Sequence, residues 1–173
     1  MAEDLGELAS WSFWVPWRTA LGVAPDRPGV YLARQGTGPV VYVGMGGERK
    51  GQGLRGRLRK YAGGLASGLA EAALDQALAD PAWLQDRLAE AQAGQTARIR
   101  EWGRAALDRA RIELCWTTTA TTQDARATER RILLALHDQH LWNRSRPRPP
   151  AAPSTRRTQH PAPTPPVTAV VQA

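Results

Sequence analysis

Five side chains of this sequence could act together on a phosphodiester bond. Tyr31 and Tyr42 lie eleven residues apart in two short β-type segments. Arg57 and Tyr61 are spaced i,i+4, so a helix would place both on one face. Glu129 lies far downstream, early in the last expected helix. An arginine can bind a phosphate through two parallel hydrogen bonds, and one carboxylate can hold a Mg²⁺ ion that keeps several waters.

These residue types are typical of a metal-dependent phosphodiester hydrolase that uses Mg²⁺ or Mn²⁺. The ion would stabilise developing charge and lower the pKa of a bound water. A tyrosine beside a cation can lose proton affinity and act as a general base. Each residue also has a plainer interpretation. Tyr31 and Tyr42 could be strand aromatics, Arg57 a cation on a solvated helix face, and Glu129 a first-turn acid favoured by the helix dipole.

An expected hairpin would bring the two tyrosines together. Residues 29–34 and 40–44 are short apolar runs, and the glycines and proline of residues 35–39 between them favour a turn. Side chains alternate between the two faces of a strand, so Tyr31 and Tyr42 can project from the same face of an antiparallel pair.

The rest of the pattern predicts helices and one more strand. The expected elements are a flexible loop at 46–53, a helix at 54–61, three helices within 65–110 (the second capped by Asp80, the third by Thr96), a strand at 111–119 and a last helix from 121 to near 140. In the strand, Ile112, Leu114 and Trp116 alternate with polar or small residues, which indicates one buried face.

Composition divides the chain into three parts. Residues 1–27 form an arm with tryptophans at every third position (11, 14 and 17), which indicates packing onto the core rather than an aromatic platform for bases. Residues 28–144 form the main domain, and 65–110 within it read as a helical insertion. Residues 145–173 hold eight of the thirteen prolines, so we expect a disordered tail.

The positive charge is unevenly distributed. The net charge is +7, but residues 144–173 contribute five arginines and no acid, which leaves 18 basic and 16 acidic residues among the first 143. Within the folded part, positive charge for binding a polyanion is concentrated in one local cluster between residues 49 and 60. The predicted DNA-contacting residues are Arg49, Lys50, Arg55, Arg59 and Lys60.

Several classes of protein are disfavoured. A single cysteine, Cys115, permits no internal disulfide, and the N-terminus lacks the basic region of a signal peptide, so we expect a cytoplasmic protein. No apolar run is long enough to span a bilayer, so no membrane partner is expected.

Residues 51–56 match a dinucleotide-binding pattern, but a preceding hairpin does not suit a βαβ unit. His137 and His140 lack the further ligands that a zinc site needs.

The sequence also resembles a known family. Gly29-Val30-Tyr31 and Tyr42-Val43-Gly44, followed by the arginine-rich helix, Glu129 and Asn143, look like the signature of the GIY-YIG endonucleases. The resemblance covers most of residues 28–144. It implies an α/β fold, with a three-stranded antiparallel sheet flanked by helices. It also implies an ion on the glutamate and hydrolysis of one DNA strand per active site.

The resemblance assigns roles by position. Tyr31 and Tyr42 would orient or activate the water, Arg57 would stabilise the pentacovalent phosphate with support from Tyr61, and Glu129 would bind Mg²⁺. The structural positions would be Gly29, Gly44 and Asn143. Two departures stand out, Met45 where the repair branch commonly has a lysine, and the insertion at 65–110, which the minimal members lack.

The expected activity is therefore that of a DNA endonuclease. A catalytically weak or inactive nucleic-acid-binding module of the same fold is the alternative from a different class, and RNA or branched DNA are alternative substrates. One centre cuts one strand, so a double-strand break would need a homodimer or two successive nicks. A larger repair or mobile-element complex is a further expected partner.

Overall fold

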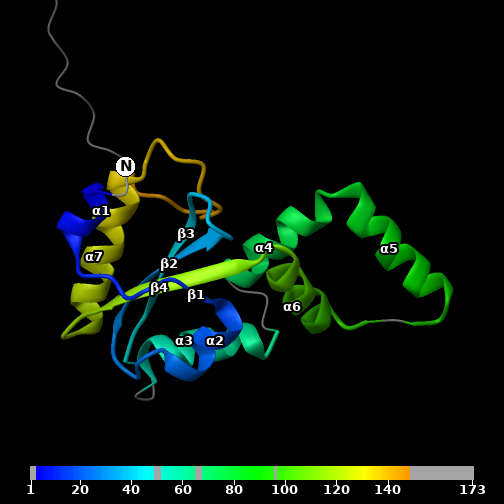
Figure 1. Cartoon of the computed structure of the whole chain (residues 1–173), viewed down its shortest axis with the longest axis horizontal. Coiled ribbons are helices and arrows are strands. Elements are labelled where there is room, and N and C mark those ends of the chain that lie inside the picture. Colours follow the sequence, from blue (N-terminus) through cyan, green and yellow to red (C-terminus); the bar gives the residue numbers. More distant parts are fainter. Residues whose placement is uncertain (1–2, 49–51, 65–67, 96, 149–173) are drawn as a thin grey trace, which may run out of the picture.

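An antiparallel sheet lies at the centre of the fold, with helices on both of its faces (Figure 1). This computed structural model describes residues 3–48, 52–64, 68–95 and 97–148. Within them, four strands lie in the order β1-β4-β2-β3, with bounds β1 (Val15–Pro16), β2 (Gly29–Gln35), β3 (Val40–Gly46) and β4 (Ile112–Thr118). The predicted count of three strands is wrong, because a two-residue strand that ends in proline gives no periodic signal.

The hairpin formed by β2 and β3 confirms the expected pairing. The strands are antiparallel, with Tyr31 opposite Gly44 and Ala33 opposite Tyr42. On the other side of β2, strand β4 pairs with it and places Trp116 opposite Tyr31. The segment that precedes residues 51–56 is therefore an antiparallel hairpin rather than part of a βαβ unit.

Helices occupy the segments that the sequence predicted, except that the last helix ends at Ala135 rather than near residue 140. Two more helices lie in the N-terminal arm. Their bounds are α1 (Glu3–Leu8), α2 (Trp17–Val23), α3 (Gly53–Ala62), α4 (Leu69–Leu78), α5 (Pro81–Gln92), α6 (Ile99–Arg109) and α7 (Thr122–Ala135). The Asp80 carboxylate accepts a hydrogen bond from Ala82 N at 2.9 Å, which confirms that cap. The expected cap at Thr96 lies outside the described residues. Arg98 is the N-cap residue of α6, and its backbone N–H donates to the Glu101 carboxylate at 2.8 Å.

Each face of the sheet has its own apolar core. One core joins the tyrosines of the hairpin to buried residues of α2, α3, α4 and α6, such as Leu58 and Leu107. The other lies under α1 and α7, where Val43, Ile132 and Leu133 are buried. Because Tyr42 and Val43 are adjacent on β3, they enter opposite cores, as strand alternation requires. The two cores fix α3 and α7 on opposite faces of the same hairpin.

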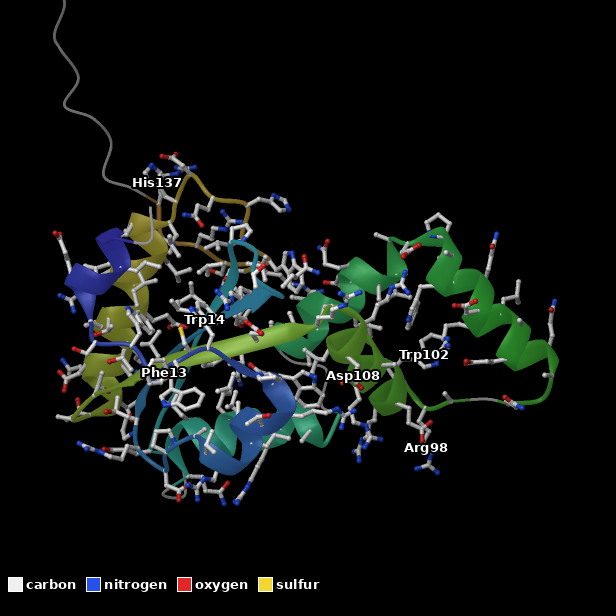
Figure 2. All side chains as sticks on the ribbon, in the orientation of Figure 1. Phe13, Trp14, Arg98, Trp102, Asp108 and His137 are labelled. Atoms are coloured by element: carbon white, nitrogen blue, oxygen red, sulfur yellow. The ribbon has the colours of Figure 1, made fainter. Side chains whose placement is uncertain are left out.

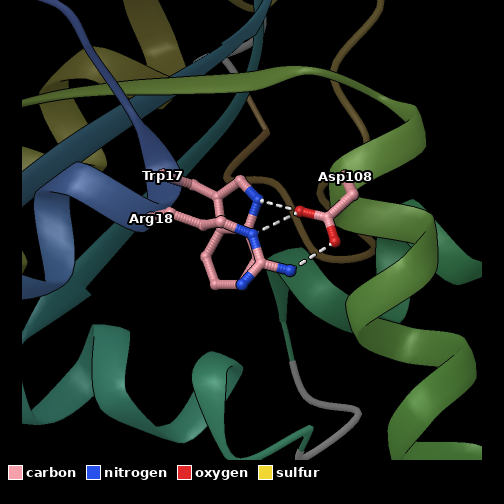
Figure 3. Close-up of polar contacts among 3 residues, drawn as sticks. All are labelled: Trp17, Arg18 and Asp108. Atoms are coloured by element: carbon pink, nitrogen blue, oxygen red, sulfur yellow. Dashed lines mark hydrogen bonds and ion pairs between the residues drawn. The ribbon is translucent and has the colours of Figure 1, made fainter.

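The insertion forms an arm that projects from the sheet (Figure 1). The indole of Trp83 on α5 meets that of Trp102 on α6 edge to face, with ring centroids 5.7 Å apart. At the base of the arm, the Asp108 carboxylate accepts from Trp17 Nε1 at 3.0 Å and from Arg18 Nε and Nη2 at 2.9 and 2.6 Å (Figure 3). These bonds join the arm to α2.

The tryptophans of the N-terminal arm pack as the sequence predicted. Trp17 is 5% exposed, and Trp11 and Trp14 are partly buried against the core under α1 and α7. The Arg34 guanidinium lies over the Trp14 ring at 4.3 Å, a favourable cation–π geometry. Phe13 is different, because it is 92% exposed (Figure 2). The predicted disorder of the tail concerns residues that, from 149 onward, lie outside the described chain. Among the helices that are described, none is long and apolar enough to cross a membrane.

A side chain covers the outer edge of β3. Asn143 accepts from Val43 N at 3.0 Å and donates to Val43 O at 2.7 Å, as a neighbouring strand would. Trp142 N also donates to Val41 O at 2.6 Å. Paired edge groups cannot template association with another chain. The structural role predicted for Asn143 is thus provided by two hydrogen bonds to the strand that carries Tyr42.

Replacing Asn143 by alanine should lower the free energy of unfolding by about 1–2 kcal/mol, because both polar groups of Val43 lose their partner. Urea unfolding followed by circular dichroism would measure this loss. Asn143→Asp keeps an acceptor for Val43 N and loses the donor to Val43 O, so its loss should be intermediate. Equal stability of all three proteins would show that these bonds contribute nothing.

Candidate active site

Three tyrosines form the centre of the candidate site, and they are all the tyrosines of the chain. The rings of Tyr31 and Tyr42 are stacked at 6.2 Å between centroids, which confirms that they project from one face of the hairpin. Tyr61 approaches the Tyr31 ring edge-on at 6.3 Å, and the two hydroxyls share a hydrogen bond of 2.5 Å. Tyr31, Tyr42 and Tyr61 are 0, 7 and 2% exposed. Residues that are distant in the sequence therefore form one cluster.

Glycines make room for this cluster. Gly44 lies opposite Tyr31 on the hairpin, and a Cβ at position 44 would collide with the end of the Tyr31 ring. A Cβ on Gly29 would meet the backbone of β4 and, at 2.8 Å, the Leu54 side chain of α3. Both predicted structural glycines therefore permit a close approach, Gly44 of a ring to the sheet and Gly29 of α3 to the sheet.

Arg57 extends from α3 into the same region. Leu54, Leu58 and Tyr61 are buried positions of this helix, and Arg57 lies at the border of that face. Its guanidinium carbon is 5.4 Å from the Tyr61 ring centroid. Its Nε atom is buried and, among the described residues, has no hydrogen-bond partner. A buried N–H without a partner is costly, so a ligand that accepts from it would bind favourably.

Gly68 marks the point where the polar groups converge. A Cβ there would lie 2.7 Å from Tyr42 Oη, 2.8 Å from Arg57 Nη2 and 3.2 Å from Tyr61 Oη, so no two of these atoms are more than about 6 Å apart. Gly68 has φ 59° and ψ −119°, a conformation that glycine adopts far more readily than other residues. This residue was not predicted from the sequence, although the glycines at 63, 64 and 68 were a usable signal of special backbone.

Glu129 approaches from the other side of the hairpin. It lies on α7 in one stripe with the buried residues Ala125 and Ile132, which explains why the carboxylate is only partly exposed. The helix begins with a reciprocal cap, in which Asp124 N donates to Thr121 Oγ1 and Thr121 N donates to Asp124 Oδ2, both at 3.1 Å. The cap and the buried stripe fix the position of Glu129.

Burial and electrostatic interactions among the groups of the site shift their pKa values. Burial raises the pKa of Glu129, while the positive charge of Arg57 acts to lower it. Burial also raises the pKa of Tyr42 to about 12, and the nearby Glu129 charge adds to that shift. The pKa of Tyr31 is raised well above its ordinary value, again chiefly by burial. The two phenols are therefore protonated at neutral pH. A tyrosine that acts as a general base needs a lowered pKa, and these pKa values are raised.

This direction predicts how the folded chain responds to alkali. The free energy of unfolding should be level up to about pH 10 and should fall as the pH approaches about 12, because the unfolded phenols then lose protons that Tyr42 still keeps. Ultraviolet titration of tyrosinate reports only on this cluster. Tyr42→Phe should make the fall smaller. Full ionisation of Tyr31 and Tyr42 near pH 10 in the intact fold would contradict the burial effect.

The predicted DNA-contacting residues have different environments. Arg59 and Lys60 are exposed on the last turn of α3. Arg55 is instead turned to the protein, donating from Nε to Ala24 O at 2.7 Å and pairing with Asp26 at 2.8 Å. These interactions indicate that Arg55 anchors the loop that contains Ala24 and Asp26 rather than contacting DNA. Arg49 and Lys50 lie outside the described residues.

The donor set at Glu129 suits a loosely held hard cation. Across the described residues, no three His, Cys, Asp or Glu side chains gather into a group that could hold a metal ion. Mg²⁺ is commonly bound by one or two carboxylates together with waters and substrate phosphate, so Glu129 alone is compatible with it. A zinc site of three or four protein ligands would not fit this donor set.

Met45 and an apolar cavity both lie away from this cluster. Met45 packs against the core under α7, while Tyr42 enters the opposite core. A cavity of about 470 Å³ opens near the N-terminal arm, lined by Trp11, Trp14, Leu32 and Cys115 among others. It shares no lining residue with the tyrosine cluster. The candidate site is therefore defined by converging polar atoms rather than by a deep pocket.

Comparisons of the chain with models of protein families, with curated proteins and with solved structures find no match. The residues of the site are consequently the basis for any functional conclusion.

Proposed function

We propose that this chain is a metal-dependent endonuclease of GIY-YIG type, which hydrolyses phosphodiester bonds of DNA one strand at a time. The observation that carries the proposal is the gathering of Tyr42 Oη, Tyr61 Oη and Arg57 Nη2 beside Gly68. The Nε of the same arginine is buried and has no partner among the described residues. A phosphate would supply acceptors to all of these donors at once.

The proposed roles follow from the environment of each group. Arg57 would bind two phosphate oxygens and stabilise the additional charge of the pentacovalent state. Tyr42 is protonated at neutral pH, so it would donate a hydrogen bond to the phosphate or orient the attacking water rather than remove a proton. Tyr31 touches Tyr61 and not solvent, which supports a positioning role.

Glu129 would hold the ion. Bound there, Mg²⁺ or Mn²⁺ would supply charge stabilisation and a water of lowered pKa. Burial raises the pKa of Glu129, so protons should compete with the ion at a higher pH than they would at an ordinary exposed glutamate. The Glu129 carboxylate is partly buried, and the positive charge of Arg57 acts on it. A phosphate bound at this site would therefore interact with both the ion and Arg57.

A DNA-binding module without catalytic activity is the second candidate. The elevated pKa values of Tyr31 and Tyr42 favour it, because they leave the site without an evident general base among these phenols. Such a module would keep Arg57 for the phosphate and would not need the ion.

Nicking of supercoiled plasmid separates the two candidates. The full chain should convert it to nicked circles in Mg²⁺ or Mn²⁺ and should stop when the ion is chelated, whereas a binding module should retard the plasmid without breaking it. A panel of linear duplex, flap, junction, single-stranded DNA and RNA would then identify the substrate. Retardation without a strand break at any concentration of either metal would overturn the endonuclease proposal.

A further inference from the structure

The charges of the insertion arm, which is formed by α4, α5 and α6, are segregated by helix. Between residues 68 and 95, which include α4 and α5, the charged side chains are five acids and one arginine. Between residues 97 and 111, which include α6, they are five arginines and two acids. One helix of the arm is therefore basic although the arm as a whole is nearly neutral.

Most of the nearby acids already have partners. Asp80 pairs with Arg109, and Asp108 is held by Trp17 and Arg18. Arg144 pairs with both Glu71 and Asp75 of α4. The remaining arginines of α6 keep their charge for an external partner, since no ion pair to Arg98, Arg100 or Arg104 occurs in the described part of the chain.

The geometry of α6 places two of these arginines on one face. Arg100 and Arg104 are spaced i,i+4, so their Cα atoms are separated by about 6 Å along the helix axis. Arg98 lies at the start of α6, at the end of the helix opposite to Asp108 (Figure 2). Arg98 and Arg100 are exposed, and Arg104 is partly exposed.

Exposed basic residues also lie on α3, the helix that carries Arg57. The end of α3 touches the start of α6, because a Cβ on Gly64 would lie 2.6 Å from Arg100 Cβ and 2.8 Å from its Cα. The last turn of α3 carries Arg59 and Lys60, both exposed, and Arg57 lies just before them. The exposed cations Arg59 and Lys60 therefore lie on a helix whose end contacts the start of the basic helix of the arm.

We propose that Arg59, Lys60, Arg98, Arg100 and Arg104, here called the basic track, bind the phosphate backbone of duplex DNA beyond the phosphate held at Arg57. The choice of DNA as the polyanion rests on the proposed function. Guanidinium and ammonium groups contact phosphates without reading bases, so the basic track contributes affinity and orientation but no sequence preference. The arm is thus a clamp for duplex beside the cleaved bond.

Counterion release gives this proposal a measurable signature. Each phosphate contact contributes about 0.9 to the slope of log affinity against log salt. Replacing Arg100 and Arg104 by alanine should lower that slope by about 1.8 and weaken binding about 30-fold at about 0.15 M salt. Lysines at both positions keep the charges, so Arg100→Lys/Arg104→Lys should restore most of the slope.

Fluorescence anisotropy of the full chain with a labelled random-sequence duplex, over a series of salt concentrations, tests the clamp. Arg131→Ala is the charge-matched control for Arg104→Ala, because Arg131 is exposed on α7, across the sheet from the arm. Circular dichroism and thermal unfolding establish that each variant is folded. A slope unchanged in the folded Arg100→Ala/Arg104→Ala variant, or a fall in Arg131→Ala equal to that in Arg104→Ala, would overturn the clamp.

Salt-dependent binding and plasmid nicking together separate this inference from the proposed function. If plasmid nicking occurs and the double variant binds duplex as tightly as the unchanged chain, the clamp is wrong and the endonuclease proposal stands. If the slope falls as expected but no strand is cut, the clamp stands and the endonuclease proposal is wrong.

Discussion

Replacing Arg57 by alanine is expected to lower the rate of DNA strand cleavage roughly 10²–10³-fold. Removing a single preorganised donor from a charge-stabilising site typically has that effect. Arg57 is suited to such a role because its guanidinium is already held beside the Tyr61 ring and its Nε has no partner within the described residues. Single-turnover cleavage of a labelled duplex, with enzyme in excess, would isolate this step from product release.

Two controls make the Arg57 prediction specific. Arg59→Ala removes the same charge from the same helix at an exposed position, so it should weaken DNA binding while the single-turnover rate at saturation is kept. Arg57→Lys retains charge but cannot form two parallel hydrogen bonds, so most of the rate should still be lost. Equal rates for Arg57→Ala and Arg59→Ala at saturation would remove Arg57 from the site.

Replacing Gly44 by alanine is expected to lower the free energy of unfolding by about 3 kcal/mol, at the upper end of overpacking costs. The added methyl would enter the space of the Tyr31 ring. That ring cannot easily move, because its hydroxyl bonds to Tyr61 and its face stacks on Tyr42. Urea unfolding would measure the loss, and activity should fall along with it because the cluster is displaced.

A double-mutant comparison identifies the cause of that loss. Tyr31→Leu shortens the side chain that the methyl would strike, so Gly44→Ala should cost less than about 1 kcal/mol in that background. Gly22→Ala is the matched control, because a Cβ there meets nothing within 4 Å and alanine favours the helix α2. If Gly44→Ala cost the same in the Tyr31→Leu background as in the unchanged chain, contact with the ring would not be the reason.

Local patterns were enough to predict the elements that carry the site. The two short apolar runs that carry Tyr31 and Tyr42, and the turn between them, indicated a hairpin, whose register then places both rings on one face. The helical spacing of Arg57 and Tyr61 was also sufficient, since both contact the same cluster. Helical spacing was enough for α3 because its buried residues lie along one face. The strands β2 and β3 are buried on both faces, so apolar runs and turn residues, rather than alternation, indicated them.

Long-range features were beyond such patterns. The two-residue strand β1 exists because β4 offers an open edge, and Gly68 is special because three side chains from other elements converge there. The direction of the tyrosine pKa shifts depends on how completely the insertion and α3 cover the rings. Arg55 was assigned to DNA from its basic neighbours, and only the fold reveals Asp26 beside it.

Glu129 and the tyrosine–arginine cluster should together form one metal-dependent site. Anomalous diffraction from crystals of the full chain soaked in Mn²⁺ examines this directly, with Glu129→Gln as the matched variant. We predict an Mn²⁺ peak on the Glu129 carboxylate, on the side that faces Tyr42 and Arg57, and no peak there in Glu129→Gln. An ion bound only elsewhere in the protein, or a peak that survives in Glu129→Gln, would show that Glu129 does not hold the metal of this site.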